Sequence, residues 1–300
     1  MNLFEAKNIS KSYGKNRFEL KEIAFALNAG EITGVVGENG NGKTTLLRIV
    51  AGDLSIDNGE LTYFGKTINE LGWEKIKQNI AYIPQRIPRW YGSLLHNLIF
   101  QASIHGIKGQ DADVLVENLI HKLSLEKYIH LNWSEISTGY RLRFQLAKML
   151  IGNPSLLVLD EPIANLDINA QNIFLNDLKK IVSDANYNVS VILSSQQLHE
   201  IENIADNILF LKQGKIIYSG AVNAVGKDRK QNEFEIKGEF SVQFLSQLFT
   251  TIQIEEIANT YYVTLPKEVN SKEFLQAILA QNKKIEYFRD ISSSTRKLFK

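Results

Sequence analysis

Apolar and polar residues follow strand-like patterns along the first part of the chain. Residues 3–10 and 17–27 alternate between the two classes, and residues 31–36 form a nearly continuous apolar run. Gly14 and Gly30 separate these segments, as expected where strands are joined by turns. The third segment leads into a glycine-rich loop, after which apolar residues recur at helical spacing. The pattern therefore predicts a strand, a loop and a helix in direct succession.

Strand-like and helical segments then alternate through the middle of the chain. The predicted elements are strands at 79–85, 155–162 and 189–195, helices within 93–130 and at 138–151, 169–185 and 196–205, and hairpins at 57–66 and 208–220. Apolar strands that alternate with helices are typical of a mostly parallel sheet with both faces covered. The sequence therefore predicts an α/β fold.

The composition changes near residue 226. Residues 226–233 are charged and lack apolar periodicity, which is typical of a linker. Beyond them the pattern predicts strand, helix, two strands, helix and strand, the split βαβ order. We therefore expect a main domain at 1–225, a linker at 226–233 and a small α+β accessory domain at 234–300.

Charge and cysteine content exclude several classes of function. The chain has 34 basic and 33 acidic side chains, so it offers no general attraction for nucleic acid. Cysteine is absent, which rules out disulfides, thiolate zinc sites and cysteine nucleophiles. No apolar run approaches the ~20 residues that a membrane helix needs, and the N-terminus lacks a signal-peptide pattern. Contact with a membrane is expected only through another protein.

The glycine-rich loop carries the strongest chemical signal. Residues 37–44 match G-x-x-x-x-G-K-[ST] at every fixed position, between a predicted strand and a predicted helix. In such loops backbone amides cradle phosphate oxygens, the lysine bridges the β- and γ-phosphates and the threonine binds Mg²⁺. The alternative is a glycine-rich turn with an incidental lysine. The predicted nucleotide-binding residues here are Gly37, Glu38, Asn39, Gly40, Asn41, Gly42, Lys43, Thr44 and Thr45.

A second motif ends the buried strand at 155–162. Four apolar residues are followed by Asp160 and Glu161, at the carboxyl end where α/β sheets bind ligands. Asp160 is predicted to hold Mg²⁺, directly or through water, and Glu161 to polarise the water that attacks the γ-phosphate. Acids that merely cap a buried strand are the alternative.

Together these motifs resemble the ATP-binding subunit of an ABC (ATP-binding cassette) transporter, over roughly residues 3–220. The resemblance implies a P-loop fold with antiparallel N-terminal strands and a helical subdomain at about 86–150. It also implies that Tyr13 stacks on adenine, that Gln85 touches Mg²⁺ and the attacking water, and that Asp167 lies in a loop between two subunits. A strand-end tyrosine packed within the protein is the alternative for Tyr13. ATP is preferred to GTP because no Asn-Lys-x-Asp run is present.

Two positions depart from the family pattern. The family signature Leu-Ser-Gly-Gly-Gln, which reaches the ATP of the partner subunit, is replaced here by Ile136, Ser137, Thr138, Gly139 and Tyr140. A histidine that contacts the γ-phosphate is replaced by Gln196, which cannot become cationic. His199 is either a substitute or, as an alternative, an exposed surface histidine. We therefore expect intact ATP binding and slow hydrolysis by the isolated protein.

The resemblance implies the energy-coupling subunit of an export-type transporter. It would work as a homodimer or heterodimer on a separate integral-membrane permease, at the cytoplasmic face of the membrane. The expected permease contact is Arg86–Leu95, where Trp90 and Tyr91 are predicted to be exposed; an ordinary packed corner is the alternative. Two other functions stay open: a nucleotide-gated regulatory subunit with little hydrolysis, and a soluble ABC ATPase outside transport.

Overall fold

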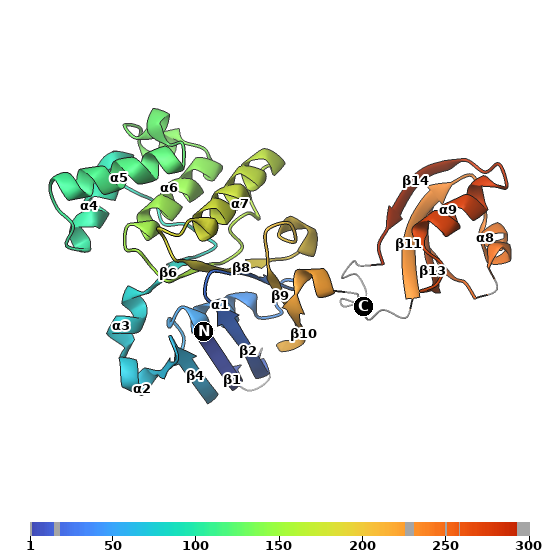
Figure 1. The fold of residues 1–300 in the computed structure, drawn as a ribbon, viewed down its shortest axis with the longest axis horizontal. Coiled ribbons are helices and arrows are strands. Elements are labelled where there is room, and N and C mark those ends of the chain that lie inside the picture. The colour runs from blue at the N-terminus through green and yellow to red at the C-terminus, as the bar shows by residue number, and fades with distance from the viewer. Residues whose placement is uncertain (1, 15–18, 226–230, 250, 258, 293–300) are drawn as a thin grey trace. The chain divides into compact units, whose positions relative to one another are not determined.

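The computed structural model describes residues 2–14, 19–225, 231–249, 251–257 and 259–292 (Figure 1). The chain divides into two compact units, Met1–Val222 and Asn223–Lys300. Of the expected linker at 226–233, residues 226–230 lie outside the described residues. Residues 231–233 differ from the expectation, because they begin strand β11 (Gln231–Gly238) and already pair with β13.

A six-stranded sheet forms the centre of the first unit, in the order β10-β9-β3-β8-β7-β6. Its strands are β3 (Ile32–Val36), β6 (Ile80–Ile83), β7 (Leu156–Leu159), β8 (Ser190–Ser195), β9 (Asn207–Lys212) and β10 (Lys215–Ala221). Neighbours pair in parallel except β9 and β10, which form the predicted hairpin. Every residue of β3, β7 and β8 is buried, because both faces of the sheet are covered. The predicted α/β fold is confirmed.

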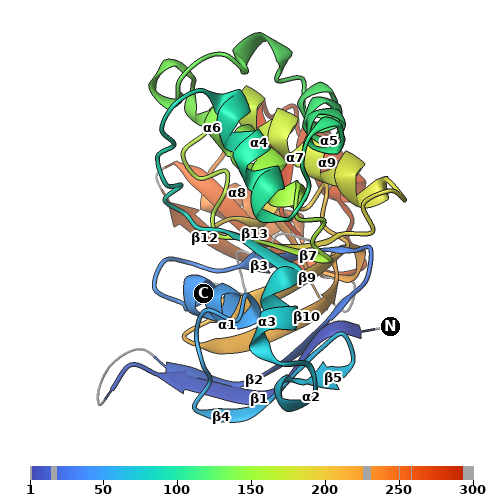
Figure 2. The ribbon, with the colours of Figure 1, turned by 90° about the vertical axis from the view of Figure 1, so that its left-hand side faces the viewer.

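A second, antiparallel sheet has the order β2-β1-β4-β5. Its strands are β1 (Asn2–Ser12), β2 (Glu19–Asn28), β4 (Asn58–Tyr63) and β5 (Lys66–Thr67). Helix α1 (Lys43–Val50) lies between the two sheets (Figure 2), and its apolar side chains join strands of both in one core. The short helices α2 (Ile68–Leu71) and α3 (Trp73–Gln78) were not predicted from the sequence.

A group of helices completes the first unit. They are α4 (Leu94–Ile104), α5 (Gln110–Lys122), α6 (Thr138–Leu150) and α7 (Ile168–Ser183), with single 3-10 turns at Glu126–Tyr128 and Trp133–Glu135. Helices α4 and α5 lie side by side (Figure 1). None of the helices in the described part of the chain combines the length and apolar character needed to cross a membrane.

The helix predicted at 196–205 is wrong. The structure has only a 3-10 turn at Leu198–Glu200, followed by further turns. The amides of Ile201 and Glu202 both donate to the carbonyl of Leu198, and those of Ile204 and Ala205 both donate to the carbonyl of Ile201. Because successive amides share one acceptor, no regular α-helical ladder propagates.

The second unit contains a four-stranded antiparallel sheet in the order β12-β13-β11-β14. Its elements after β11 are α8 (Val242–Leu248), β12 (Gln253–Ile257), β13 (Thr260–Pro266), α9 (Ser271–Leu279) and β14 (Ile285–Asp290). The chain order is therefore strand, helix, strand, strand, helix, strand. Its core combines aliphatic and aromatic side chains, and Phe234 stacks on both Phe274 and Phe288.

Candidate functional site

The glycine-rich loop joins the end of β3 to the start of α1. Gly40 and Gly42 have φ values of 83° and 101°, in the left-handed region that disfavours side chains. A Cβ at Gly37 would lie 2.5 Å from the carbonyl oxygen of Leu211 on β9. The loop therefore needs glycine at these positions, for its turn and for its close approach to the neighbouring strand.

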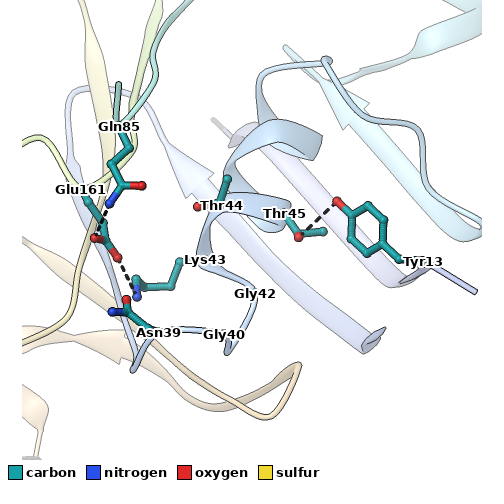
Figure 3. A pocket seen from close by; sticks show the side chains of 9 residues that line it. All are labelled: Tyr13, Asn39, Gly40, Gly42, Lys43, Thr44, Thr45, Gln85 and Glu161. Atoms are coloured by element: carbon teal, nitrogen blue, oxygen red, sulfur yellow. Dashed lines mark hydrogen bonds and ion pairs between the residues drawn. The ribbon is translucent and has the colours of Figure 1, made fainter. Parts of the chain in front are cut away.

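The loop forms one wall of a pocket of about 480 Å³ (Figure 3). The lining residues come from the segment after β1, from the loop and α1, and from the segments after β6 and β7. They are Tyr13, Asn39, Gly40, Gly42, Lys43, Thr44, Thr45, Gln85 and Glu161. Most of the residues predicted to bind nucleotide thus surround one space.

Three other predicted loop residues lie beside the pocket rather than in its lining. The carbonyl oxygens of Gly37 and Glu38 accept hydrogen bonds from Lys43 Nζ, at 2.7 and 3.2 Å. The Asn41 side chain turns away and accepts a hydrogen bond from the Gln213 amide in the β9–β10 hairpin, at 2.9 Å. These residues hold the loop in shape.

Lys43 and Glu161 form a buried ion pair at the pocket wall. Lys43 Nζ lies 2.9 Å from Glu161 Oε1, and the two side chains are only 4% and 7% exposed. With the two loop carbonyls, Glu161 completes the hydrogen bonding of the ammonium group. The lysine charge is therefore fully engaged inside the protein, next to the space that the glycine loop encloses (Figure 3).

The other carboxylate oxygen of Glu161 is held by two amides. Gln85 Nε2 and Gln196 Nε2 each donate to Glu161 Oε2 at 3.0 Å. The Glu161 backbone has φ of 43°, unusual for a residue other than glycine, and its N–H donates to Ser194 Oγ at 2.8 Å. Strained backbone of this kind is concentrated at functional sites. Glu161, which follows β7, is thus held by residues that follow the two neighbouring strands, β6 and β8.

Asp160 lies one residue earlier and is almost fully buried, at 2% exposure. Its Oδ1 accepts a hydrogen bond from Ser194 Oγ at 2.9 Å. Burial raises the pKa of the Asp160 carboxyl, against the opposing effect of hydrogen bonds from Thr44 and Ser194. Sequence reasoning missed the role of Ser194, although its hydroxyl at the end of an apolar strand was a usable signal.

Tyr13 lines the outer part of the pocket. Its hydroxyl lies 3.3 Å from Thr45 Oγ1 at the start of α1, and 41% of its surface is exposed (Figure 3). An aromatic ring held at its tip and open on one side is suited to stacking on a flat ring.

The altered signature lies outside this pocket. Ser137 caps α6 by accepting a hydrogen bond from the Tyr140 amide, and Thr138 is exposed beside it. The Tyr140 ring is only 3.9 Å from the Tyr128 ring, centroid to centroid. A Cβ on Gly139 would approach the Cβ of Ala170, at 3.1 Å.

Two further residues support this region. Asp167 caps α7 by accepting a hydrogen bond from the Ala170 amide at 2.9 Å. Arg143 lies 5.7 Å from the centre of the Tyr140 ring, and its Nε donates to Asp177 Oδ2 at 2.7 Å in a buried ion pair. The role of Asp177 was not predicted from the sequence, because Asp177 lies 34 residues from Arg143 and no local pattern links the two.

The predicted exposure of Trp90 is wrong. Trp90 is 5% exposed, its indole N–H donates to Gln145 Oε1 at 3.1 Å, and its ring stacks on Trp133 at 5.0 Å. Tyr91, by contrast, is 80% exposed. Two aromatic neighbours in the sequence point in opposite directions here, because α6 and the Trp133 turn supply a pocket for only one of them.

Comparison with known proteins identifies the family. A family model described as ABC transporter matches residues 20–164. The phosphonates import ATP-binding protein PhnC of Treponema denticola is 30% identical over 238 residues, which cover 75% of this chain and 92% of that protein. The chain belongs to the ABC transporter family. As an ABC ATP-binding subunit it is an ATPase that couples hydrolysis to transport.

Two further matches extend this result. The lipoprotein-releasing system ATP-binding protein LolD of Buchnera aphidicola is 31% identical to the ABC subunit over 220 residues, covering 71% of this chain and 95% of that protein. The structure of cbiO1 from Clostridium perfringens, part of the transporter complex cbiONQ, has a TM-score of 0.70 and 22% identity, over 76% of this chain and 91% of that chain. The second match shows the shared fold. Since the related proteins serve both import and release, the export direction stays a prediction.

Proposed function

We propose that the pocket binds Mg-ATP, with the triphosphate along residues 37–44 and the adenine against Tyr13. The observation that carries this proposal is the buried ion pair of Lys43 and Glu161, 2.9 Å apart beside the glycine loop. Lys43 would exchange its ion pair with Glu161 for contacts to phosphate oxygens, which would leave Glu161 as the acid next to the terminal phosphate. The loop amides and the start of α1 add partial positive charge.

Thr44 and Asp160 are proposed to hold Mg²⁺, together with Gln85. Hydroxyl, carboxylate and amide oxygens are suitable ligands for this ion. The described residues contain no group of three or more His, Cys, Asp or Glu side chains that would enclose a metal by themselves. That fits magnesium, which usually takes one or two carboxylates and completes its coordination with phosphate and water. When bound, the ion neutralises charge that develops on the phosphates.

The contacts of Glu161 support a proposal for how hydrolysis begins and for why it should be slow. For Lys43 to contact phosphate, its ion pair with Glu161 must break, which frees Oε1 to accept a hydrogen bond from the attacking water. Gln85 and Gln196 can continue to donate their hydrogen bonds to Glu161 Oε2. Gln196 adds no positive charge, and a missing charge-assisted contact costs ~3–4 kcal/mol in the transition state, or about 10²–10³ in rate.

A dimer of ATP-binding subunits is proposed, either with a second copy or with another ABC ATPase chain. Ser137, Thr138 and Asp167 are not part of the lining of the chain's own pocket. Ser137 and Thr138 are exposed at the start of α6, where helix amides favour an anion. These positions are therefore free to complete the ATP site of a partner.

An exposed apolar surface is proposed to contact the membrane permease. It consists of Tyr91, Phe100 and Ile104, which are 80%, 67% and 61% exposed. Phe100 and Ile104 lie one turn apart on α4, and Asn97 of the same helix donates to the Tyr91 carbonyl at 2.7 Å. Large exposed apolar side chains gathered in this way mark interaction sites. These three residues, called the permease-facing surface, are proposed as the contact in place of the buried Trp90. Binding to the permease through them would place the subunit at the inner face of the cytoplasmic membrane.

Nucleotide binding is tested with Lys43→Ala and, as a control at an exposed lysine outside the loop, Lys66→Ala. Titration of labelled ATP with Mg²⁺ should show a large loss of affinity for Lys43→Ala and little change for Lys66→Ala, which does not line the pocket. Thermal unfolding of both variants checks that they remain folded. Equal affinity in all three proteins would refute the proposed site.

ATPase assays with and without the co-purified permease then separate the possible functions. Activity that rises in the complex supports the transporter subunit. Intact ATP binding with negligible turnover in both states would instead identify a nucleotide-gated regulatory subunit. The uncharged amide of Gln196, in place of a histidine, is the observation that keeps this second function open. The second unit, Asn223–Lys300, is proposed to act as a separate accessory domain in either case.

A further inference from the structure

A second apolar feature lies between α4 and α5, away from the permease-facing surface. A groove of about 560 Å³ has Leu95 and Ile99 of α4 on one side and Val116 and Ile120 of α5 beneath. On a helix the row formed by residues 95 and 99 is turned by about 140° from the row formed by residues 100 and 104. The groove and the permease-facing surface are thus separate surfaces of the same helix.

The rim of the groove on the α5 side is acidic. Asp113 and Glu117 lie one turn apart on α5, and Glu126 follows at the 3-10 turn. His121 completes this edge and pairs with Glu126, with 2.9 Å between Nδ1 and Oε1. Among the described residues, no lysine or arginine lines the groove.

The two rows on α5 give the groove a direction. The apolar floor of Val116 and Ile120 runs parallel to the ridge of Asp113 and Glu117, since both pairs are spaced by four residues. From Asp113 to His121 the helix advances about 12 Å, which is slightly more than two turns. This shape fits a short helix with an apolar stripe, flanked by positive charge on the side that faces α5.

We infer that the groove between α4 and α5 binds a basic amphipathic helix of a second protein. Apolar side chains of that helix would pack on Leu95, Ile99 and Ile120, and its lysines or arginines would face Asp113 and Glu117. The acidic rim selects the sign of the ligand's charge, since a helix with glutamates in the same positions would be repelled. This inference goes beyond the proposed ATP and permease sites and does not depend on either.

The test uses the full chain and two labelled peptides of about 14 residues, long enough to cover the groove. One has leucines at i, i+3, i+4 and i+7 with flanking lysines, and the other has glutamate for each lysine. Fluorescence anisotropy should give at least ~10-fold tighter binding of the lysine peptide, with affinity that weakens as salt is added. Equal binding of the two peptides would overturn the inference.

Matched variants locate the binding. Asp113→Lys with Glu117→Lys should weaken binding of the lysine peptide by ~10-fold or more. Glu60→Lys with Glu74→Lys makes the same change in net charge at exposed positions elsewhere and should leave binding unchanged. If both double variants weaken it equally, the peptide binds by general charge attraction and the groove is not its site.

A pair of single variants on α4 tests the apolar part. Ile99→Ser should reduce peptide affinity, whereas Ile104→Ser on the permease-facing surface should not. ATP affinity should be unchanged in both, which keeps this test distinct from that of the nucleotide site. Concentration-dependent self-association that disappears in Asp113→Lys with Glu117→Lys would show that a second copy of this chain fills the groove, and would overturn the proposed occupant.

Discussion

Replacing Trp90 by alanine tests whether this side chain packs inside the protein, as the structure shows, or is exposed for contact with the permease, as the sequence suggested. Removing a nearly buried indole costs about 3–5 kcal/mol in transfer and cavity terms. Gln145, which is 3% exposed, also loses the donor to its Oε1, and a buried acceptor without a partner costs about 1–3 kcal/mol. The total, about 4–8 kcal/mol, is a large part of the stability of an ordinary domain.

The matched variants are Tyr91→Ala and Trp90→Phe. Tyr91 is 80% exposed, so its removal should change the free energy of unfolding by at most about 0.5 kcal/mol. Trp90→Phe keeps an aromatic ring against Trp133 but leaves Gln145 without its donor, and should cost about 1–3 kcal/mol. The order of stability should therefore be wild type and Tyr91→Ala, then Trp90→Phe, then Trp90→Ala.

Urea unfolding followed by tryptophan fluorescence is the assay. Trp73, Trp90 and Trp133 all lie in the first unit, so the signal reports that unit alone. With a slope of roughly 2–3 kcal/mol per molar urea, Trp90→Ala should lower the midpoint by about 1.3–4 M. A loss below about 1 kcal/mol would refute the packing described here. A stable Trp90→Ala protein that no longer binds the permease would show that Trp90 is an interface residue after all.

Three further predictions concern the catalytic and signature regions. Gln196→His should raise the steady-state ATPase rate by up to about 10²–10³-fold, because it restores a group that can carry positive charge near the proposed position of the γ-phosphate; an unchanged rate would remove Gln196 from the mechanism. Tyr140→Gln should lower stability by about 1 kcal/mol through loss of the ring contact with Tyr128, yet raise turnover measured at concentrations where subunits dimerise; reduced turnover of the folded variant would contradict this. Asp177→Ala should destabilise the first unit by about 3–5 kcal/mol in urea unfolding, because it leaves the Arg143 guanidinium buried without its partner, and a loss under 1 kcal/mol would show that the pair is not buried in solution.

The sequence predicted the features that depend on near neighbours along the chain. A strand, a loop with glycines at fixed spacing and an amphipathic helix together define the phosphate loop, and residues 37–44 form the turn that their spacing predicts. The hairpins at 57–66 and 208–220 and most helices were equally visible, because turn residues and the helical period act within a few positions. The helix predicted at 196–205 is wrong because the backbone there forms consecutive turns, in which pairs of amides share one carbonyl, and the local pattern does not reveal them.

The side-chain partners were decided by the tertiary structure. Gln85 and Gln196 are 76 and 35 residues from Glu161, yet both donate to the same carboxylate oxygen. Their approach requires β6, β7 and β8 to lie next to one another in the parallel sheet, which no local pattern specifies.

The orientation of Trp90 and Tyr91 has the same origin. A tryptophan beside a tyrosine in a turn has no intrinsic preference for the interior, and the Trp133 ring and Gln145 amide that receive Trp90 come from later segments. The amino-acid sequence by itself thus determined which chemistry this chain carries and which elements hold it. The folded structure decided which side chains meet and which stay exposed, because burial depends on segments that approach from far along the chain.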